Sequence, residues 1–147
     1  NLLCAHELAM AALYRTFSTI STEDASFWNR IALEEQAHAD VLRRLDEMMI
    51  SGKVTWKPGV WRASDLCESL DFIAAKQSNA AYRKMNAEEA CRAALFIERG
   101  IIEHDFFTAF ESAAPEIRRE FDALRAHTVE HVQQLQDRLK RIGRRWR

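Results

Sequence analysis

Glycine and proline are scarce in this sequence, with four and two residues among 147. Because both residue types interrupt regular helices, their scarcity favours long helices. Alanine, leucine, glutamate and arginine are abundant instead, and no run of alternating β-branched residues predicts a strand. We therefore expect an all-α protein without strands, and its length is that of a single domain covering residues 1–147.

Cysteine is scarce as well. Cys4, Cys67 and Cys91 lie far apart in the sequence and show no C-x-x-C spacing. This pattern argues against a disulfide framework and against a rubredoxin-type or zinc-ribbon module. A reducing cytoplasm is the plain interpretation of such cysteine usage.

Neither sign of charge dominates, since the formal net charge at pH 7 is -1. Such a chain has no overall field that attracts nucleic acid or anionic lipid. It also lacks an apolar run of the roughly eighteen residues that a membrane span needs. We therefore expect neither nucleic acid nor a membrane as a partner. The end of the chain from Arg138 onward is strongly basic, which suits a solvated helix C-terminus better than a binding patch.

What the sequence does contain is the motif EEQAH at residues 34–38, inside a segment of helical periodicity. Glu35 and His38 fall on the same helix face as Trp28 and Leu42, at spacings of three and four. A carboxylate and an imidazole therefore point into an otherwise apolar face. Because burying an ionised carboxylate alone costs on the order of several kcal/mol, Glu35 needs a cation, a hydrogen-bond network or a raised pKa. A metal ion would satisfy both side chains together.

The first and last predicted helices repeat this pattern in part. A helix expected from Leu2 to about Ser18 carries Glu7 on an apolar stripe. A helix expected from Pro115 to about Gly143 carries Thr128 and His131 on its inward stripe. Each helix thus offers a polar side chain to the interior.

The second helix is expected to begin after an N-cap at Ser21 or Thr22 and to end near Ile50. Residues 51–63 contain glycine, proline and tryptophan and predict a long irregular loop. Residues 64–85 predict an additional helix. Together, residues 51–85 are expected to form a crossover between two pairs of core helices.

The next core helix is expected to run from Ala87 to about Glu111, with Asn86 as its N-cap. It carries Glu98 and Glu103, which lie roughly 140° apart around the helix and cannot both face inward squarely. Glu98 shares a clean apolar stripe with Cys91, whereas the stripe through Glu103 also contains arginines. Glu98 is therefore the favoured interior carboxylate, and Glu103 is second.

The two halves of the chain repeat one pattern, a helix with an inward Glu followed by a helix with E-x-x-H. The last helix departs from this pattern, because it has T-x-x-H. This pattern resembles the ferritin-like superfamily and, within it, the rubrerythrin-like proteins, whose di-metal site takes these ligands from four helices. The resemblance covers nearly the whole chain except residues 51–85. It implies a four-helix bundle with a long crossover and an extra helix between core helices 2 and 3. The metal ligands that it implies are Glu7, Glu35, His38, Glu98 and His131, with Glu103 held second to Glu98.

The resemblance also implies a function. Carboxylate and imidazole ligands suit iron or manganese, and zinc is an alternative. Two iron ions are expected if the site is intact, with oxidoreductase activity toward peroxide or dioxygen. Because the chain has no C-x-x-C pairs for a rubredoxin relay, an external electron donor is expected as a partner. A homodimer is compatible with the tryptophans expected at the surface, Trp56, Trp61 and Trp146.

Thr128 departs from the family pattern, because it stands where the family has the glutamate of the second E-x-x-H motif. This removes one negative charge and one bridging ligand, which Glu103 or His127 is placed to replace. Two alternatives stay open. One is a non-catalytic interaction or storage-shell protein with a degenerate site. The other is a single zinc ion held by His38, His131 and carboxylates.

Residues near the expected ligands are expected to occupy ordinary core or surface positions. Tyr14 is expected in the core, within reach of a site carboxylate. Glu34 is expected to be solvated and paired with Arg30 one helical turn earlier. His6 and His104 lie off the ligand stripes and are expected at the surface.

Overall fold

The computed structural model describes residues 2–58, 62–82, 85–103 and 106–145. Most of these residues are helical, which confirms the expectation of a mainly α protein. Within the described ranges the helices are α1 (Leu2–Phe17), α2 (Ala25–Ile50), α3 (Ala63–Ala81), α4 (Ala87–Glu103) and α5 (Pro115–Arg145). A short 3-10 helix, η1 (Phe106–Ala109), and two strands, β1 (Thr55–Trp56) and β2 (Phe110–Glu111), complete the described elements.

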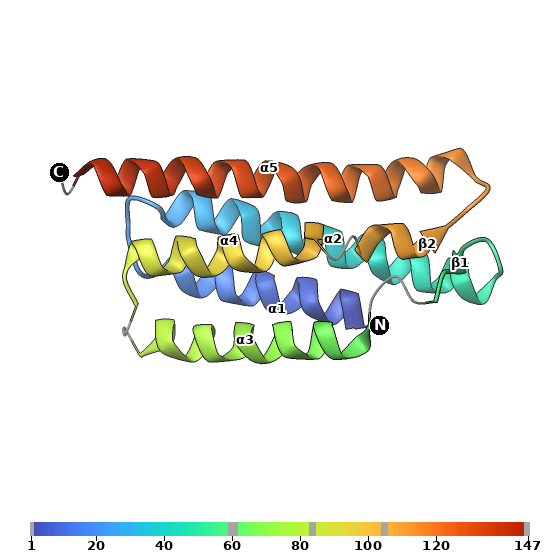
Figure 1. The fold of residues 1–147 in the computed structure, drawn as a ribbon, viewed down its shortest axis with the longest axis horizontal. Helices are drawn as coiled ribbons and strands as arrows, with labels where there is room; N and C mark the ends of the chain where they lie inside the picture. Colours follow the sequence, from blue (N-terminus) through green and yellow to red (C-terminus); the bar gives the residue numbers. More distant parts are fainter. Residues whose placement is uncertain (1, 59–61, 83–84, 104–105, 146–147) are drawn as a thin grey trace.

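The helices lie roughly along one common direction, with α5 at one edge of the molecule and α3 at the opposite edge (Figure 1). α1 packs extensively against α2 and α3, and α4 packs against α5. α2 and α5 touch each other more sparsely. The interior is thus enclosed by α1, α2, α4 and α5, while α3 covers the outer side of α1.

The core follows the periodicity of the sequence. Leu3, Met10, Tyr14 and Phe17 of α1 share one stripe and are all buried. The ring of Trp28 in α2 packs on this stripe, with its centroid 5.6 Å from that of Tyr14 and 5.1 Å from that of Phe17. Alternating spacings of three and four therefore predicted correctly which side chains join α1 to α2.

The expected helix boundaries are partly right. α1 and α2 end within one residue of their predicted C-terminal ends. An N-cap at Ser21 or Thr22 is wrong, because the backbone N–H of Asp24 donates to the carbonyl of Ser21 at 3.2 Å in a turn. This turn delays the first helical residue to Ala25, with Asp24 at the N-cap position.

The cap expected before α4 is confirmed. Asn86 Oδ1 accepts a hydrogen bond from the backbone N–H of Glu89 at 3.0 Å, and Glu89 Oε2 accepts one from the N–H of Asn86 at 2.8 Å. Pro115 opens α5 as expected, whereas an end at Gly143 is wrong, because α5 continues to Arg145.

The expectation of no strands is wrong, as is a helix that continues to Glu111. β1 pairs antiparallel with β2, with Trp56 opposite Phe110. The ring of Phe110 contacts the ring of Trp56 at 5.3 Å between centroids and stacks on Phe121 at the same distance. The apolar run at residues 106–110 thus forms a 3-10 helix and part of a strand pair. Hydrophobic periodicity alone does not distinguish these elements from an α-helix.

A helix between α2 and α4 is confirmed, although α3 ends at Ala81 rather than near Met85. Trp56 lies in β1, while Trp61 and Trp146 are outside the described residues. None of the described helices is both long enough and apolar enough to cross a membrane.

Candidate metal centre

Five of the six expected ligands converge in the interior enclosed by α1, α2, α4 and α5. Each of the five is no more than 3% exposed: Glu7, Glu35, His38, Glu98 and His131. The side chain of the sixth, Glu103, is outside the part of the chain that the structure describes. Glu98 is thus buried, as expected of the interior carboxylate of α4, and its rank over Glu103 stays a prediction.

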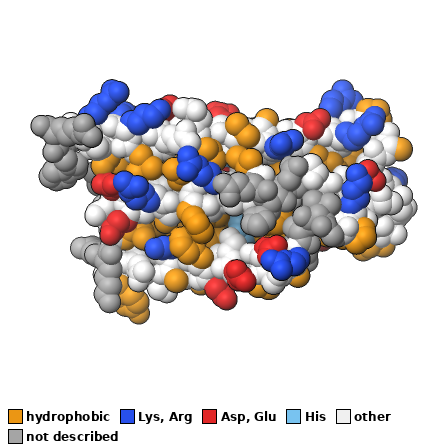
Figure 2. Space-filling view, in the orientation of Figure 1, with side chains coloured by type: hydrophobic (Ala, Val, Ile, Leu, Met, Phe, Trp, Pro, Cys, Tyr) orange, Lys and Arg blue, Asp and Glu red, His pale blue; other side chains and the backbone are white. Residues whose placement is uncertain are grey.

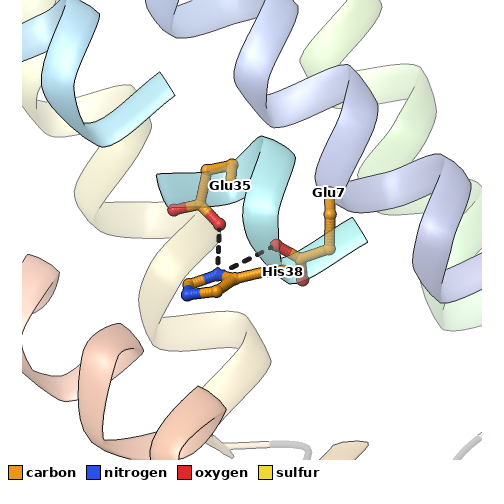
Figure 3. A group of neighbouring side chains, drawn as sticks. All are labelled: Glu7, Glu35 and His38. Atoms are coloured by element: carbon orange, nitrogen blue, oxygen red, sulfur yellow. Dashed lines mark hydrogen bonds and ion pairs between the residues drawn. The ribbon is translucent and has the colours of Figure 1, made fainter. Parts of the chain in front are cut away.

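The first group of ligands consists of Glu7, Glu35 and His38. His38 Nδ1 lies 2.8 Å from Glu35 Oε2 and 3.6 Å from Glu7 Oε2. Figure 3 shows both carboxylates pointing at this one ring nitrogen. One ligand atom from each residue lies within 4.8 Å of the other two, which is close enough for one ion to contact all three.

The second group consists of Glu35, Glu98 and His131. His131 Nδ1 lies 2.9 Å from Glu35 Oε1 and 3.2 Å from Glu98 Oε1. These three ligand atoms also lie within 4.8 Å of one another. Glu35 belongs to both groups and presents a different oxygen to each imidazole. The two groups therefore share one carboxylate, that of Glu35, and each could hold a metal ion.

The hydrogen bonding of these groups fits a cation. Glu7 Oε2, Glu35 Oε1 and His131 Nδ1 are buried and make no hydrogen bond to any described residue, although the last two lie only 2.9 Å apart. Buried polar atoms without a well-aligned hydrogen bond are rare in folded proteins, and a bound cation would satisfy these. Three carboxylates and two imidazoles supply hard oxygen and borderline nitrogen donors, which suit iron, manganese or zinc.

The outer ring nitrogens of both histidines have partners of their own. His131 Nε2 lies 2.7 Å from Glu34 Oε2, and Arg30 donates to the other oxygen of Glu34 at 2.6 Å. His38 Nε2 lies 3.1 Å from His127 Nδ1. Metal-binding histidines typically use one nitrogen for the ion and the other for such a partner, which fixes the ring.

Glu34 shows what the sequence missed. Its pairing with Arg30 is confirmed, but its contact with His131 was not expected. Glu34 is next to Glu35 in the sequence and off the apolar stripe, so nothing within α2 signals a partner on α5. The contact depends on how the two helices lie in space.

Tyr14 and Thr128 flank the centre. The hydroxyl of Tyr14 donates to Glu98 Oε1 at 2.8 Å, which confirms that this tyrosine reaches a site carboxylate. Thr128 is buried, but its hydroxyl donates to the carbonyl of Leu124 on its own helix at 3.1 Å and belongs to neither ligand group. His127, expected as a replacement ligand, contacts only the outer nitrogen of His38 among the ligands.

No family model, curated protein or solved structure matches the chain.

Protonation in the absence of a metal follows from the charges. Burial and the nearby carboxylate of Glu35 raise the pKa of Glu7 to about 7. Burial by itself would lower the pKa of both histidines, but the carboxylates around them outweigh it. The contacts with Glu35 and Glu7 raise the pKa of His38 to about 10, and those with Glu35 and Glu98 raise the pKa of His131 to about 11. Without a metal, protons on the imidazoles would balance the carboxylates.

His6 was expected at the surface, and that expectation is wrong. Its side chain is 1% exposed, because α3 covers this side of α1 and Ser69 Oγ lies 2.7 Å from His6 Nε2. His104 is outside the described residues.

A cavity of about 230 Å³ lies beside the centre, where α2 and α5 are more loosely packed. His38, His127 and Glu34 line it together with Arg44, Glu120 and apolar side chains. Because His127 is itself exposed, the cavity connects the outer side of His38 with solvent.

Proposed function

We propose that this chain is a ferritin-like four-helix bundle that binds two metal ions, with iron preferred, and reduces peroxide or dioxygen in the manner of rubrerythrin-like proteins. The core helices would be α1, α2, α4 and α5, with α3 as the additional helix of the crossover. The observation that carries the proposal is the pair of buried Glu and His groups that share Glu35.

The ligand groups assign a role to each residue. Glu7 and His38 would hold one ion, Glu98 and His131 would hold the other, and Glu35 would contact both. The three carboxylates carry three negative charges, one fewer than the four positive charges of two divalent ions. A reduced set of this kind favours labile ions over a closed structural site, in keeping with a centre that reacts.

When bound, iron would supply single electrons for cleavage of the O–O bond. The chain itself would hold the imidazoles in place through Glu34 and His127, and the hydroxyl of Tyr14 would fix Glu98. The cavity between α2 and α5 is large enough for peroxide to approach the centre. Reduction of one peroxide to two waters consumes two electrons and two protons, which an external donor and solvent would supply.

A peroxide-consumption assay tests this function. We expect the iron-loaded chain, supplied with a chemical reductant, to consume peroxide, and the Glu35→Ala and His131→Ala variants to lose nearly all of this activity. Glu47→Ala is the matched control, because Glu47 is an exposed residue of the same helix as Glu35. Circular dichroism checks that each variant is still helical. Activity retained in both site variants would refute the assignment.

One observation favours a second candidate. Because the Thr128 hydroxyl bonds to its own helix rather than to the centre, the site has one carboxylate fewer than the family pattern. A single zinc ion, or a bundle that serves as an interaction or storage-shell subunit, would fit such a reduced site. Anaerobic titration with zinc and with Fe(II) separates these functions by the number of ions held per chain, which is one for a single-zinc site and none for a bundle whose site has degenerated.

A further inference from the structure

A second cavity, of about 630 Å³, lies between α3 and α4 and plays no part in the proposed function. His6 of α1, Phe72 of α3 and Phe96 of α4 are among the residues that line it. Figure 2 shows hydrophobic side chains gathered on the face between these two helices. The volume falls within the roughly 300–1,000 Å³ typical of small-molecule sites.

The walls of this cavity are aromatic. The rings of Phe72 and Phe96 lie 4.8 Å apart between centroids, at an interplanar angle of 46°. Phe106 contributes a third ring to the lining. Phe96 is 65% exposed, which is unusual for a large apolar side chain and leaves its ring available to a ligand. Such walls favour a planar ring over a flexible chain.

The charged residues of the lining balance one another. Asp65 and Glu68 carry negative charge, while Arg92 and Arg99 carry positive charge. Arg92 is already paired with Glu88 on its own helix, at 2.7 Å. A ligand with a net charge would meet repulsion from one set as well as attraction from the other. The lining is thus complementary to a neutral ligand.

The polar anchor of the cavity is the pair of His6 and Ser69, which both line it. His6 Nε2 lies 2.7 Å from Ser69 Oγ, whereas His6 Nδ1 is buried and has no hydrogen-bond partner among the described residues. The tautomer of the ring decides whether each nitrogen donates or accepts. A hydroxyl group can also do either, so it matches this pair in both tautomers, whereas a carbonyl matches only one.

We propose that the cavity between α3 and α4 binds a neutral aromatic molecule that carries a hydroxyl group, a compound of the phenol class. The ring packs against Phe72 and Phe96, and the hydroxyl meets the pair of His6 and Ser69. Gly100 provides room, because it lines the cavity and a Cβ placed there would meet no heavy atom within 4 Å. This site does not depend on a metal in the centre.

Calorimetric titration of the metal-free chain with three probes tests the ligand class. The probes are 2-naphthol, naphthalene and 2-naphthoate, which differ in the hydroxyl group and in charge. We expect 2-naphthol to bind roughly 3- to 10-fold more tightly than naphthalene, the gain of one net hydrogen bond. Tighter binding of 2-naphthoate would overturn the neutral ligand. Equal binding of naphthalene would overturn the polar anchor, and no binding of any probe would overturn the site.

Two glycine variants test the location. Gly100→Leu fills the cavity while replacing a poor helix former by a good one, so the fold is retained and binding of 2-naphthol is lost. Gly143→Leu is the matched control, because a Cβ at Gly143 in α5 also meets no heavy atom within 4 Å and this residue does not line the cavity. Undiminished binding in Gly100→Leu, or equal loss in Gly143→Leu, would refute the location. A dimer of the unaltered chain that Gly100→Leu abolishes would also refute it, by making a second copy the occupant.

Discussion

At the scale of single residues, each histidine of the centre is held from two sides. His131 has its Nδ1 between two buried carboxylates and its Nε2 against Glu34. The hydroxyl of Tyr14 similarly donates a hydrogen bond to the carboxylate of Glu98. These contacts set the direction of each ligand atom before any ion binds, and they can be removed one at a time.

Replacing Tyr14 by phenylalanine removes only the hydroxyl that donates to Glu98. Because Glu98 is buried, we expect the free energy of unfolding of the metal-free chain to fall by about 1–3 kcal/mol. Urea unfolding followed by circular dichroism measures this. Tyr82→Phe serves as the control, since Tyr82 is 76% exposed and its hydroxyl should contribute less than about 0.5 kcal/mol. Equal effects of the two variants would contradict the role of the hydrogen bond.

Replacing Thr128 by glutamate creates a second E-x-x-H motif, with the new carboxylate one turn before His131. We expect affinity for the second iron ion to rise by roughly ten- to a hundredfold, the scale on which carboxylates near metal ligands act. Anaerobic titration with Fe(II) measures both dissociation constants. Thr128→Gln has the same size without the charge and should give no gain. If both variants bind iron equally, the missing charge is not what limits the site.

At the scale of the elements, periodicity is what sequence predicts best. The interior faces of α1, α2 and α4 follow from spacings of three and four, and so does the burial of Glu7, Glu35 and Glu98. The strand pair of β1 and β2 could not be predicted in this way, because each strand has two residues and the paired residues are 54 and 56 positions apart in the sequence. The contact of Glu34 with α5 is likewise a product of packing between helices.

The start of α4 depends on the reciprocal hydrogen bonds of Asn86 and Glu89. Asn86→Ala removes the side-chain acceptor, and we expect the free energy of unfolding to fall by about 1 kcal/mol. Asn79→Ala, at an exposed position within α3, is the control and should not destabilise the chain, since alanine is the better helix former. Thermal unfolding compares the two. A destabilisation by Asn79→Ala as large as that by Asn86→Ala would show that the cap is not the cause.

At the scale of the whole molecule, the centre would link the proposed metal binding to protonation. In the metal-free fold the pKa of His38 is raised from 6.5 to about 10 and that of His131 to about 11. The stabilisation from these protonated imidazoles is therefore complete below pH 6.5 and is lost as the pH rises through the raised values. A metal ion needs the same nitrogens without their protons, so its contribution to stability rises over this range.

This linkage gives a pH prediction. Zinc is used as the probe because it is not oxidised. We expect added zinc to raise the melting temperature more at about pH 8.5 than at about pH 6.5. Calorimetry in two buffers of different ionisation enthalpy should also detect release of the imidazole protons on binding. A shift that shrinks with rising pH, or binding without proton release, would contradict the use of His38 and His131 as ligands.

The overall arrangement is predictable only in part. The sequence predicts the helices, the order of their interior groups and the additional helix of the crossover. It cannot predict that α2 and α5 leave a cavity beside His38, or that α3 buries His6, because both depend on distances between helices. The same distances decide whether the carboxylate of Glu35 contacts one histidine or two.

Counting iron tests the central claim most directly. The metal-free chain is titrated anaerobically with Fe(II), passed through a desalting column and analysed for iron and protein. Because two buried ligand groups share Glu35, the account predicts about two iron ions per chain, and close to none in the isosteric variant Glu35→Gln. About one ion or fewer in the unaltered chain, or an unchanged count in Glu35→Gln, would contradict it.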